Sequence, residues 1–390
     1  MTTSEPIPFR RSRGMRDQLP SAMRTFRRVE DAFRDAAGHW GYEEIRTPTL
    51  ETYSLFTVAG GLTPEALSRV YTFLDWDGWS GERIVVRPDS TIPVARAAVE
   101  AGMPIPARLS YVQSRFLFAE NEDAEQWQCG LEFLGAPEIT GDVEVATVGC
   151  DFLSALGLEP VLRLSHVGVT HAAAALVGGG EAPADLREVR SALSPDSPAL
   201  AFIDAALNPT QGGRLARNLR SLAENSIPEV LPALDDLDRV ASALVESGRR
   251  VVIDLSMPHD FEYYTGVVLE FEIGDIRVGS GGRYAPGWSG LTSTACGVAL
   301  GVSPITMALG VRVPAEPVVS VVADTPEDYG RAVKLASALH RSGINASLDS
   351  SPGGPFAVRV RGEQMFAVRP EGQQELSSLD QLVELLIDAK

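Results

Sequence analysis

Four short clusters of polar residues have the types and spacing from which a binding site for a small charged molecule could be built. The first, Asp89-Ser90-Thr91, follows the apolar run at 84–86. A carboxylate and a hydroxyl at the end of a strand can bind the amine of a ligand. The same residue types are common helix N-caps, because their side chains accept hydrogen bonds from free backbone N–H groups. For this cluster alone, capping is the more frequent outcome.

The second cluster lies on a long β-like run in which Gln128, Gly130 and Glu132 alternate and so share one face of a strand. A glycine between two polar side chains leaves room for a small polar ligand to lie against the strand. A solvated strand face explains the same alternation equally well.

The third and fourth clusters are FEYYTG, with Tyr263 and Tyr264, and GSGGRY, with Gly281-Gly282-Arg283-Tyr284. A glycine run allows close backbone approach to a ligand, and tyrosine hydroxyls can fix an imidazole or a carboxylate. A tight turn would explain the glycines as well. Core tyrosines whose hydroxyls are satisfied at the rim would explain the tyrosines.

The residues between these clusters predict the elements that must position them. Apolar residues at spacings of three and four over 21–40 predict an amphipathic helix. The β-like runs that follow are often separated by gaps of turn length, which favours an antiparallel sheet flanked by helices over a doubly wound parallel sheet. These runs are 70–74, 84–87, 109–118, 131–134, 251–255, 267–271 and 276–278.

Changes in composition along the chain predict its domain organisation. Residues 167–248 are rich in Ala, Leu and Arg and predict a helical insertion, after which strand patterning resumes. Residues 1–166 and 249–313 would then form one α+β core. Strand-like and helix-like segments alternate over 314–390, which predicts a small C-terminal α/β domain.

The balance of charged residues excludes several classes of protein. The chain carries 34 basic and 52 acidic residues, a formal net charge of −18, and its lysines are Lys334 and Lys390 alone. A phosphate-binding loop with its lysine is therefore excluded, as is a Schiff-base lysine before position 334. Such acidity argues against a broad surface for nucleic acid, although it is compatible with a local basic groove.

The remaining composition predicts a cytoplasmic protein without a metal or cofactor. Three cysteines and five histidines lack the spacing of zinc ligands. No apolar stretch approaches the roughly 18 residues of a membrane helix. The N-terminal residues have no secretory leader pattern.

The order of the motifs along the chain carries more information than any single one. GMRD at 14–17, the helix at 21–40, TPTLE, RPDST, QCGLEFLG, the helical insertion, FEYYTG and GGRY occur in sequence. Over nearly the whole chain this order resembles the histidyl-tRNA synthetases, which are class II synthetases. The resemblance implies an antiparallel sheet that binds histidine and ATP, a dimer formed through the first helix and TPTLE, and a C-terminal α/β domain that reads the anticodon.

The chain departs from that family where the synthetases handle phosphate and carboxylate. Leu117 and Pro304 stand where the family carries arginines for ATP, with Ser303 in place of a glutamate, and His259 replaces an arginine that helps activate the histidine carboxylate. The AENEDAEQW loop has four acids and no base. These losses remove most electrostatic stabilisation of an adenylation transition state. Arg115, on the same strand face as Leu117, remains available as a shifted substitute.

A retained amino-acid pocket with a lost nucleotide site is similar to the family of ATP phosphoribosyltransferase regulatory subunits, which are synthetase paralogues of histidine biosynthesis. The resemblance implies a non-catalytic protein that binds a short-form catalytic subunit in a hetero-octamer, activates it and mediates feedback inhibition by histidine. The residues that would bind histidine as effector are Asp89, Thr91, Gln128, Glu132, Tyr263, Tyr264, Gly281, Gly282, Arg283 and Tyr284.

In this assignment the carboxylates Glu132 and Asp89 face the cationic groups of histidine, while Gln128 and the tyrosines orient its ring or carboxylate. An effector site at a subunit interface is an alternative. Two other functions stay open: a divergent histidyl-tRNA synthetase or a stand-alone amino-acid-activating paralogue, and an interaction protein without a ligand. Residues 314–390 carry 7 basic and 11 acidic residues, so no tRNA partner is expected.

Overall fold

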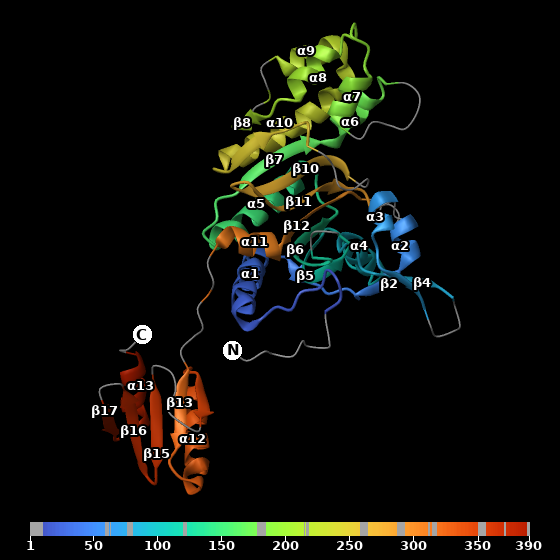
Figure 1. Cartoon of the computed structure of the whole chain (residues 1–390). Coiled ribbons are helices and arrows are strands. Elements are labelled where there is room, and N and C mark those ends of the chain that lie inside the picture. The colour runs from blue at the N-terminus through green and yellow to red at the C-terminus, as the bar shows by residue number, and fades with distance from the viewer. Residues whose placement is uncertain are drawn as a thin grey trace, which may run out of the picture. The chain divides into compact units, whose positions relative to one another are not determined.

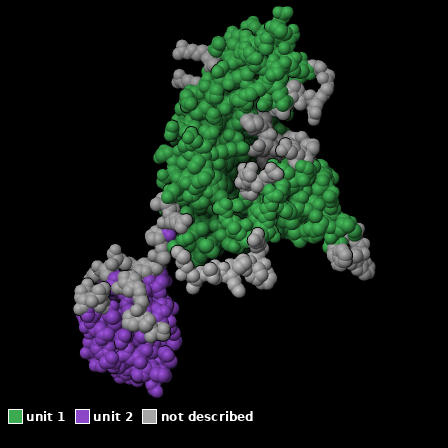
Figure 2. Space-filling model, in the orientation of Figure 1, with its two compact units in different colours: residues 1–312 green, residues 313–390 purple. Residues whose placement is uncertain are grey.

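The computed structural model describes residues 11–58, 62, 64–75, 81–119, 123–177, 185–213, 215, 218–257, 264–286, 293–310, 313, 318–349, 356–369 and 372–387. The chain divides into two compact units, Met1–Arg312 and Val313–Lys390 (Figure 2). Each unit has a hydrophobic core of its own. The candidate site residues all belong to the first unit.

A nine-stranded sheet is the centre of the first unit (Figure 1). Most neighbouring strands are antiparallel, and the parallel pairs are β1 with β5 and β7 with β9. In spatial order the strands are β1 (Glu43–Glu44), β5 (Ala107–Phe116), β6 (Glu125–Leu134), β12 (Ala295–Gly301), β11 (Ile276–Tyr284), β10 (Tyr264–Ile273), β7 (Val161–His166), β9 (Arg250–Ile253) and β8 (Thr210–Gln211).

Three helices pack on one face of this sheet: α1 (Pro20–His39), α5 (Thr140–Ala155) and α11 (Val302–Leu309). Helix α1 begins with proline at its first turn, where the missing N–H costs nothing. Its apolar stripe meets α5 and the sheet, with Phe33 edge-on to Phe152 at 5.3 Å between ring centroids and Phe26 edge-on to Trp127 at 5.4 Å. The opposite face of the sheet is thereby left for the polar clusters.

A smaller three-stranded sheet, in the order β2 (Leu50–Thr52), β4 (Arg83–Val86), β3 (Thr72–Leu74), lies beside α2 (Tyr53–Val58), α3 (Pro64–Ser68) and α4 (Thr91–Glu100). Its core contains Phe56, Leu62, Val85 and Ile92. This small sheet leads the chain into α4, the helix that carries Thr91 to the large sheet.

The segment between β7 and β9 is helical in the part that the structure describes, apart from the short strand β8. It consists of α6 (Val167–Ala174), α7 (Leu186–Ala192), α8 (Leu200–Ala206), α9 (Leu219–Ser226), the 3-10 turn η1 (Pro228–Val230) and α10 (Leu231–Glu246). Its buried apolar residues belong to the same hydrophobic cluster as those of α5 and the large sheet, and α10 contacts α5, β7 and β9 directly. The helices therefore extend the core of the sheet.

The second unit is a five-stranded mixed sheet with two contacting helices, α12 (Tyr329–Arg341) and α13 (Leu379–Ile387), and the 3-10 turn η3 (Pro326–Asp328). Strand β13 pairs in parallel with β14 and β15, and the remaining pairs are antiparallel. In spatial order the strands are β14 (Ala346–Asp349), β13 (Val319–Ala323), β15 (Ala357–Arg361), β16 (Gln364–Arg369) and β17 (Gly372–Leu376).

The predicted α+β fold, with a largely antiparallel sheet flanked by helices and a small C-terminal α/β domain, is confirmed. The sequence analysis did not identify β12, a central strand, because its sequence ACGVALG is built from small residues with weak strand preference. None of the helices in the described ranges is long and apolar enough to cross a membrane.

Candidate functional site

The side of the large sheet that faces away from α1, α5 and α11 has glycines at its centre, which form the floor of the candidate site. Strand register places Glu132, Gly297, Gly282 and Val268 directly opposite one another on four neighbouring strands. Neither glycine could carry a side chain here: a Cβ at Gly297 would lie 2.1 Å from Glu132 Oε2, and one at Gly282 would lie 3.1 Å from Tyr264 Cδ1. The Glu132 carboxyl and the Tyr264 ring therefore lie over this floor.

Glu132 is the buried centre of the site. Its side chain is 0% exposed, Thr91 Oγ1 donates to Oε1 at 2.7 Å, and the Tyr284 hydroxyl donates to Oε2 at 2.7 Å. The pKa of the Glu132 carboxyl is raised to about 8, mainly by burial and to a smaller extent by the nearby Asp89, while the hydrogen bonds from Thr91 and Tyr284 oppose the shift. At neutral pH this carboxyl is therefore mainly protonated in the free protein, and a cationic ligand would favour its ionised form.

Asp89 is held at the start of α4. Its Oδ1 accepts a hydrogen bond from the backbone N–H of Ile92 at 3.1 Å, and the residue is 6% exposed. The capping interpretation of this cluster is thus confirmed, and Asp89 rather than Ser90 is the acceptor. Burial raises the pKa of Asp89, while its backbone hydrogen bonds and the charge of Arg115 oppose the shift. Both carboxyl groups thus lie in a region that disfavours negative charge.

Tyr111, which the sequence analysis did not identify, fills the space beside Gly130. The two residues pair across β5 and β6, and a Cβ at Gly130 would lie 2.1 Å from Tyr111 Cζ. The expectation that Gly130 leaves room for a ligand is therefore wrong, because an aromatic ring occupies that room. The sequence did contain a signal for Tyr111: Leu109, Tyr111 and Gln113 alternate along their strand and so share one face of it.

Two buried hydroxyls in this cluster lack a hydrogen bond of acceptable geometry with any described residue: Ser90 Oγ and Tyr111 Oη. Tyr111 lies close to Thr91 and Glu132. A buried hydroxyl without a partner costs about 1–3 kcal/mol. Such groups mark places where a polar ligand or an ordered water would bind.

Gln128 lies on the same face as Glu132 but four residues along β6, which is about 13 Å. It pairs with Gln113 and Gly301, and its side chain is half-buried. It is therefore at the far end of the floor, outside the cluster formed by Glu132, Thr91 and Tyr284.

Arg283 and Gly281 lie on the opposite face of the sheet from Glu132. The Arg283 guanidinium bonds Asp142 of α5 at 2.7 Å, the carbonyls of Ala136 and Pro137, and Thr294 Oγ1. A Cβ at Gly281 would lie 2.1 Å from the Gly297 carbonyl oxygen. Alternation along β11 therefore turns both residues away from the Glu132 cluster, and these contacts give them structural roles; their part in binding a ligand stays a prediction.

The tyrosine cluster is described only in part. Tyr263 and His259 lie outside the described residues. Tyr264 begins β10 and packs both against the apolar cluster that contains Tyr111 and Tyr284 and against a second one that contains Met257 and Val268. Of the ten predicted site residues, the structure thus brings together Asp89, Thr91, Glu132, Tyr264, Gly282 and Tyr284.

The positions that bind phosphate in the synthetases carry no cation here. Leu117 is 9% exposed, and its backbone N–H is bonded to the Ala124 carbonyl at 3.0 Å. Ser303 and Pro304 form the first turn of α11, with Pro304 packed close to Gly301. The adjacent floor instead carries Glu270, in an ion pair with Arg277 at 2.9 Å. Leu117, Ser303 and Pro304 themselves offer no positive charge to neutralise a triphosphate.

Comparison with known proteins shows the family to which the chain belongs. The family model described as Histidyl-tRNA synthetase matches residues 14–305. The ATP phosphoribosyltransferase regulatory subunit of Dehalococcoides mccartyi strain CBDB1 is 35% identical, over 92% of this chain and 93% of that relative. The histidine–tRNA ligase of Methanoculleus marisnigri is 30% identical, over 87% of this chain and 85% of that relative.

Solved structures agree. A Bacillus halodurans C structure described as an ATP phosphoribosyltransferase regulatory subunit/histidyl-tRNA synthetase has a TM-score of 0.75 and 25% identity, over 88% of this chain and 93% of that one. Apo histidyl-tRNA synthetase of S. aureus shares the fold with a TM-score of 0.69 at 22% identity, over 97% of this chain and 99% of that one. The chain therefore belongs to the histidyl-tRNA synthetase family, with its class II fold. Within that family it groups with the ATP phosphoribosyltransferase regulatory subunits, as the sequence resemblance predicted.

Proposed function

We propose that this chain is the regulatory subunit of a cytoplasmic ATP phosphoribosyltransferase. In this role it binds and activates a short-form catalytic subunit in a hetero-octamer, at the first step of histidine biosynthesis, and lets histidine inhibit the complex. It does not itself catalyse a reaction. The observation that carries the proposal is a polar cluster around Glu132 on a glycine floor, beside nucleotide positions that hold Leu117, Ser303 and Pro304.

Histidine is the ligand that the described cluster suits. Its ammonium or imidazolium group would lie against Glu132, whose ionised form it would stabilise, with Asp89 at the rim of the same cluster. The Tyr264 ring offers an apolar wall for the imidazole. Tyr263 and Gln128 are proposed to orient the far end of the ligand. Inhibition then requires that histidine binds two states of the complex with different affinity.

The proposal is tested by following phosphoribosyl-ATP formation by a short-form catalytic subunit from the same source. The rate is measured with and without this protein across a histidine titration. Activation that histidine reverses is the expected result. Absence of activation at any protein ratio would overturn the proposed role.

A second candidate function is amino-acid activation, which Arg115 favours because its charge acts on Asp89 inside the site. Its guanidinium is bonded to Gln126 Oε1 at 2.8 Å. Histidine-dependent exchange of pyrophosphate into ATP discriminates the two functions. Exchange without activation of the phosphoribosyltransferase would establish the activating enzyme. A tRNA partner is not proposed, since residues 314–390 are net acidic.

We also propose that two copies associate through the three-stranded sheet and α1. One face of that sheet exposes apolar side chains that are cross-strand neighbours: Leu50 beside Val86, and Phe73 beside Ile84. Leu50 and Phe73 are 50% and 46% exposed. A contiguous apolar sheet face of this kind supports burial against a second copy. Sedimentation velocity of Phe73→Ser against wild type tests it: an unchanged dimer, or a wild type that is monomeric at micromolar concentration, would contradict it.

A further inference from the structure

Tyr264 joins two parts of the molecule. On one side it packs against the apolar cluster of Tyr111 and Tyr284, next to the Glu132 carboxyl. On the other side it packs against a small cluster of Val167, Met257 and Val268. Val167 is the first residue of α6, so this second cluster already includes the helical segment between β7 and β9.

Met257 is held by the turn that precedes it. Its backbone N–H donates to the Asp254 carbonyl at 3.3 Å, and Asp254 Oδ1 accepts from Ser256 N at 3.0 Å and Ser256 Oγ at 2.7 Å. Asp254 and Ser256 are 7% and 3% exposed. The Asp254 carboxylate is also paired with Arg163 at 3.4 Å. The turn is therefore fixed from the sheet side.

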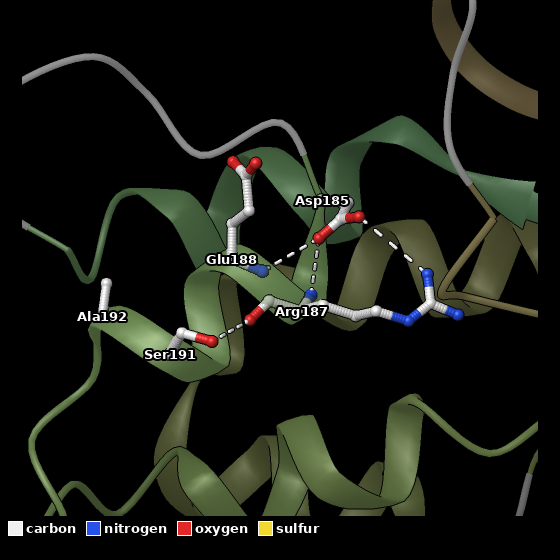
Figure 3. Close-up of a pocket in the computed structure, with 5 residues that line it drawn as sticks. All are labelled: Asp185, Arg187, Glu188, Ser191 and Ala192. Atoms are coloured by element: carbon white, nitrogen blue, oxygen red, sulfur yellow. Dashed lines mark hydrogen bonds and ion pairs between the residues drawn. The ribbon is translucent and has the colours of Figure 1, made fainter.

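Arg187 holds the same turn from the helical segment. It belongs to α7, and its guanidinium donates to the Ser256 carbonyl from Nη1 at 3.2 Å and to Ser256 Oγ from Nη2 at 3.1 Å. Figure 3 shows the Asp185 carboxylate facing the backbone nitrogens of Arg187 and Glu188, while the Arg187 guanidinium extends away from Ser191 and Ala192. Asp185 caps α7 and so fixes the residue from which the guanidinium reaches out.

We propose that Arg187 is a positioning residue for the amino-acid site: through Ser256 it fixes Met257, and Met257 holds the Tyr264 ring over Gly282. The shallow depression around Arg187 is lined by residues of α7 and by its N-cap, Asp185. This inference rests on the proposed histidine site and extends it. The helical segment thereby affects the histidine affinity of a site that is built on the large sheet and α4.

The test compares Arg187→Met with Arg190→Met in the full chain. Arg190 is on the same helix and pairs with Asp204 at the surface, so its loss is a matched control. Histidine affinity is measured by calorimetry, and amide hydrogen exchange is followed over Tyr264–Val268. We expect Arg187→Met to weaken histidine binding about threefold to tenfold, the loss of one or two exposed hydrogen bonds. Exchange at the start of β10 should rise, and Arg190→Met should change neither quantity.

Two further variants separate positioning from a general loss of structure. Arg187→Lys keeps a donor for the Ser256 carbonyl and should recover part of the affinity. In a Met257→Ala background, Arg187→Met should have no further effect, because the path to Tyr264 is already broken. Equal effects of Arg187→Met in both backgrounds would overturn the inference.

The outcomes also distinguish this inference from the proposed function. Wild type that binds histidine, with Arg187→Met binding it equally well, overturns the positioning role alone. Wild type that binds no histidine, alone or with the catalytic subunit, overturns the histidine site. In that case hydrogen exchange still tests whether Arg187 positions Tyr264. Unchanged exchange at Tyr264–Val268 in Arg187→Met overturns this positioning role, and raised exchange supports it.

Discussion

The carboxyl group of Glu132 lies over the α-carbon of Gly297, its partner in the neighbouring strand, so closely that a Cβ there would stand 2.1 Å from Oε2. The position of the buried Glu132 carboxyl therefore depends on the absence of a side chain at Gly297. A side chain at 297 would displace the group that holds both Thr91 and Tyr284.

Gly297→Ala should therefore abolish histidine binding while the protein still folds. The methyl group forces Glu132 to another rotamer and breaks its two hydrogen bonds, a loss of about 2 kcal/mol or more in stability. Calorimetric titration with histidine and thermal unfolding measure the two effects. Ala299→Ser, on the same strand face, is the control and should bind normally. Normal binding by Gly297→Ala would refute the site.

Replacing Glu132 by Gln should change the pH dependence of stability. The pKa of this carboxyl is about 8 in the folded protein against 4.5 ordinarily, so the folded state binds more protons between these values. The contribution of this carboxyl to the stability of the wild type therefore falls as pH rises from about 4.5 to 8, by up to a few kcal/mol.

Glu132→Gln cannot lose that proton, so its stability relative to wild type should increase steadily over this window. Urea unfolding of both proteins at several pH values measures the difference. A constant difference between pH 5 and 8 would show that Glu132 is ionised throughout.

Tyr111→Phe and Tyr284→Phe should have opposite effects on the ligand-free protein. The Tyr111 hydroxyl is buried without a hydrogen bond of acceptable geometry to any described residue, so its removal should raise stability by about 1 kcal/mol. The Tyr284 hydroxyl is bonded to Glu132, so its removal should lower stability by about the same amount. If the Tyr111 hydroxyl meets the ligand, Tyr111→Phe also weakens histidine binding. Denaturant unfolding that gave both variants the same sign would contradict this assignment.

Arg283→Met should destabilise the protein by about 3–5 kcal/mol, because it leaves the Asp142 carboxylate buried without its partner. Arg283→Met with Asp142→Leu should recover much of the loss, since both charges are then removed. Histidine affinity of the folded fraction should stay close to wild type. A selective loss of affinity with normal stability would return Arg283 to the ligand site.

The sequence allowed prediction of the fold because its motifs occur in a specific order and the helix at 21–40 has a clear apolar period. It predicted Glu132, Thr91 and Tyr284, which do meet. It treated GGRY as one group, whereas alternation along β11 places Gly282 and Tyr284 on the face of Glu132 and turns Arg283 toward Asp142. Nor could it predict that Tyr111 covers Gly130, because residues paired across strands are distant along the chain.

The shared core of the first unit has a thermodynamic consequence. Because α6 to α10 bury their apolar residues in the same cluster as α5 and the sheet, these helices have no separate core with which to persist when the sheet melts. A variant lacking residues 167–248 would expose part of that cluster and aggregate. The second unit, whose core is its own, would give a separate calorimetric transition, so that heating divides the chain near residue 313 and not at the borders of the helical segment.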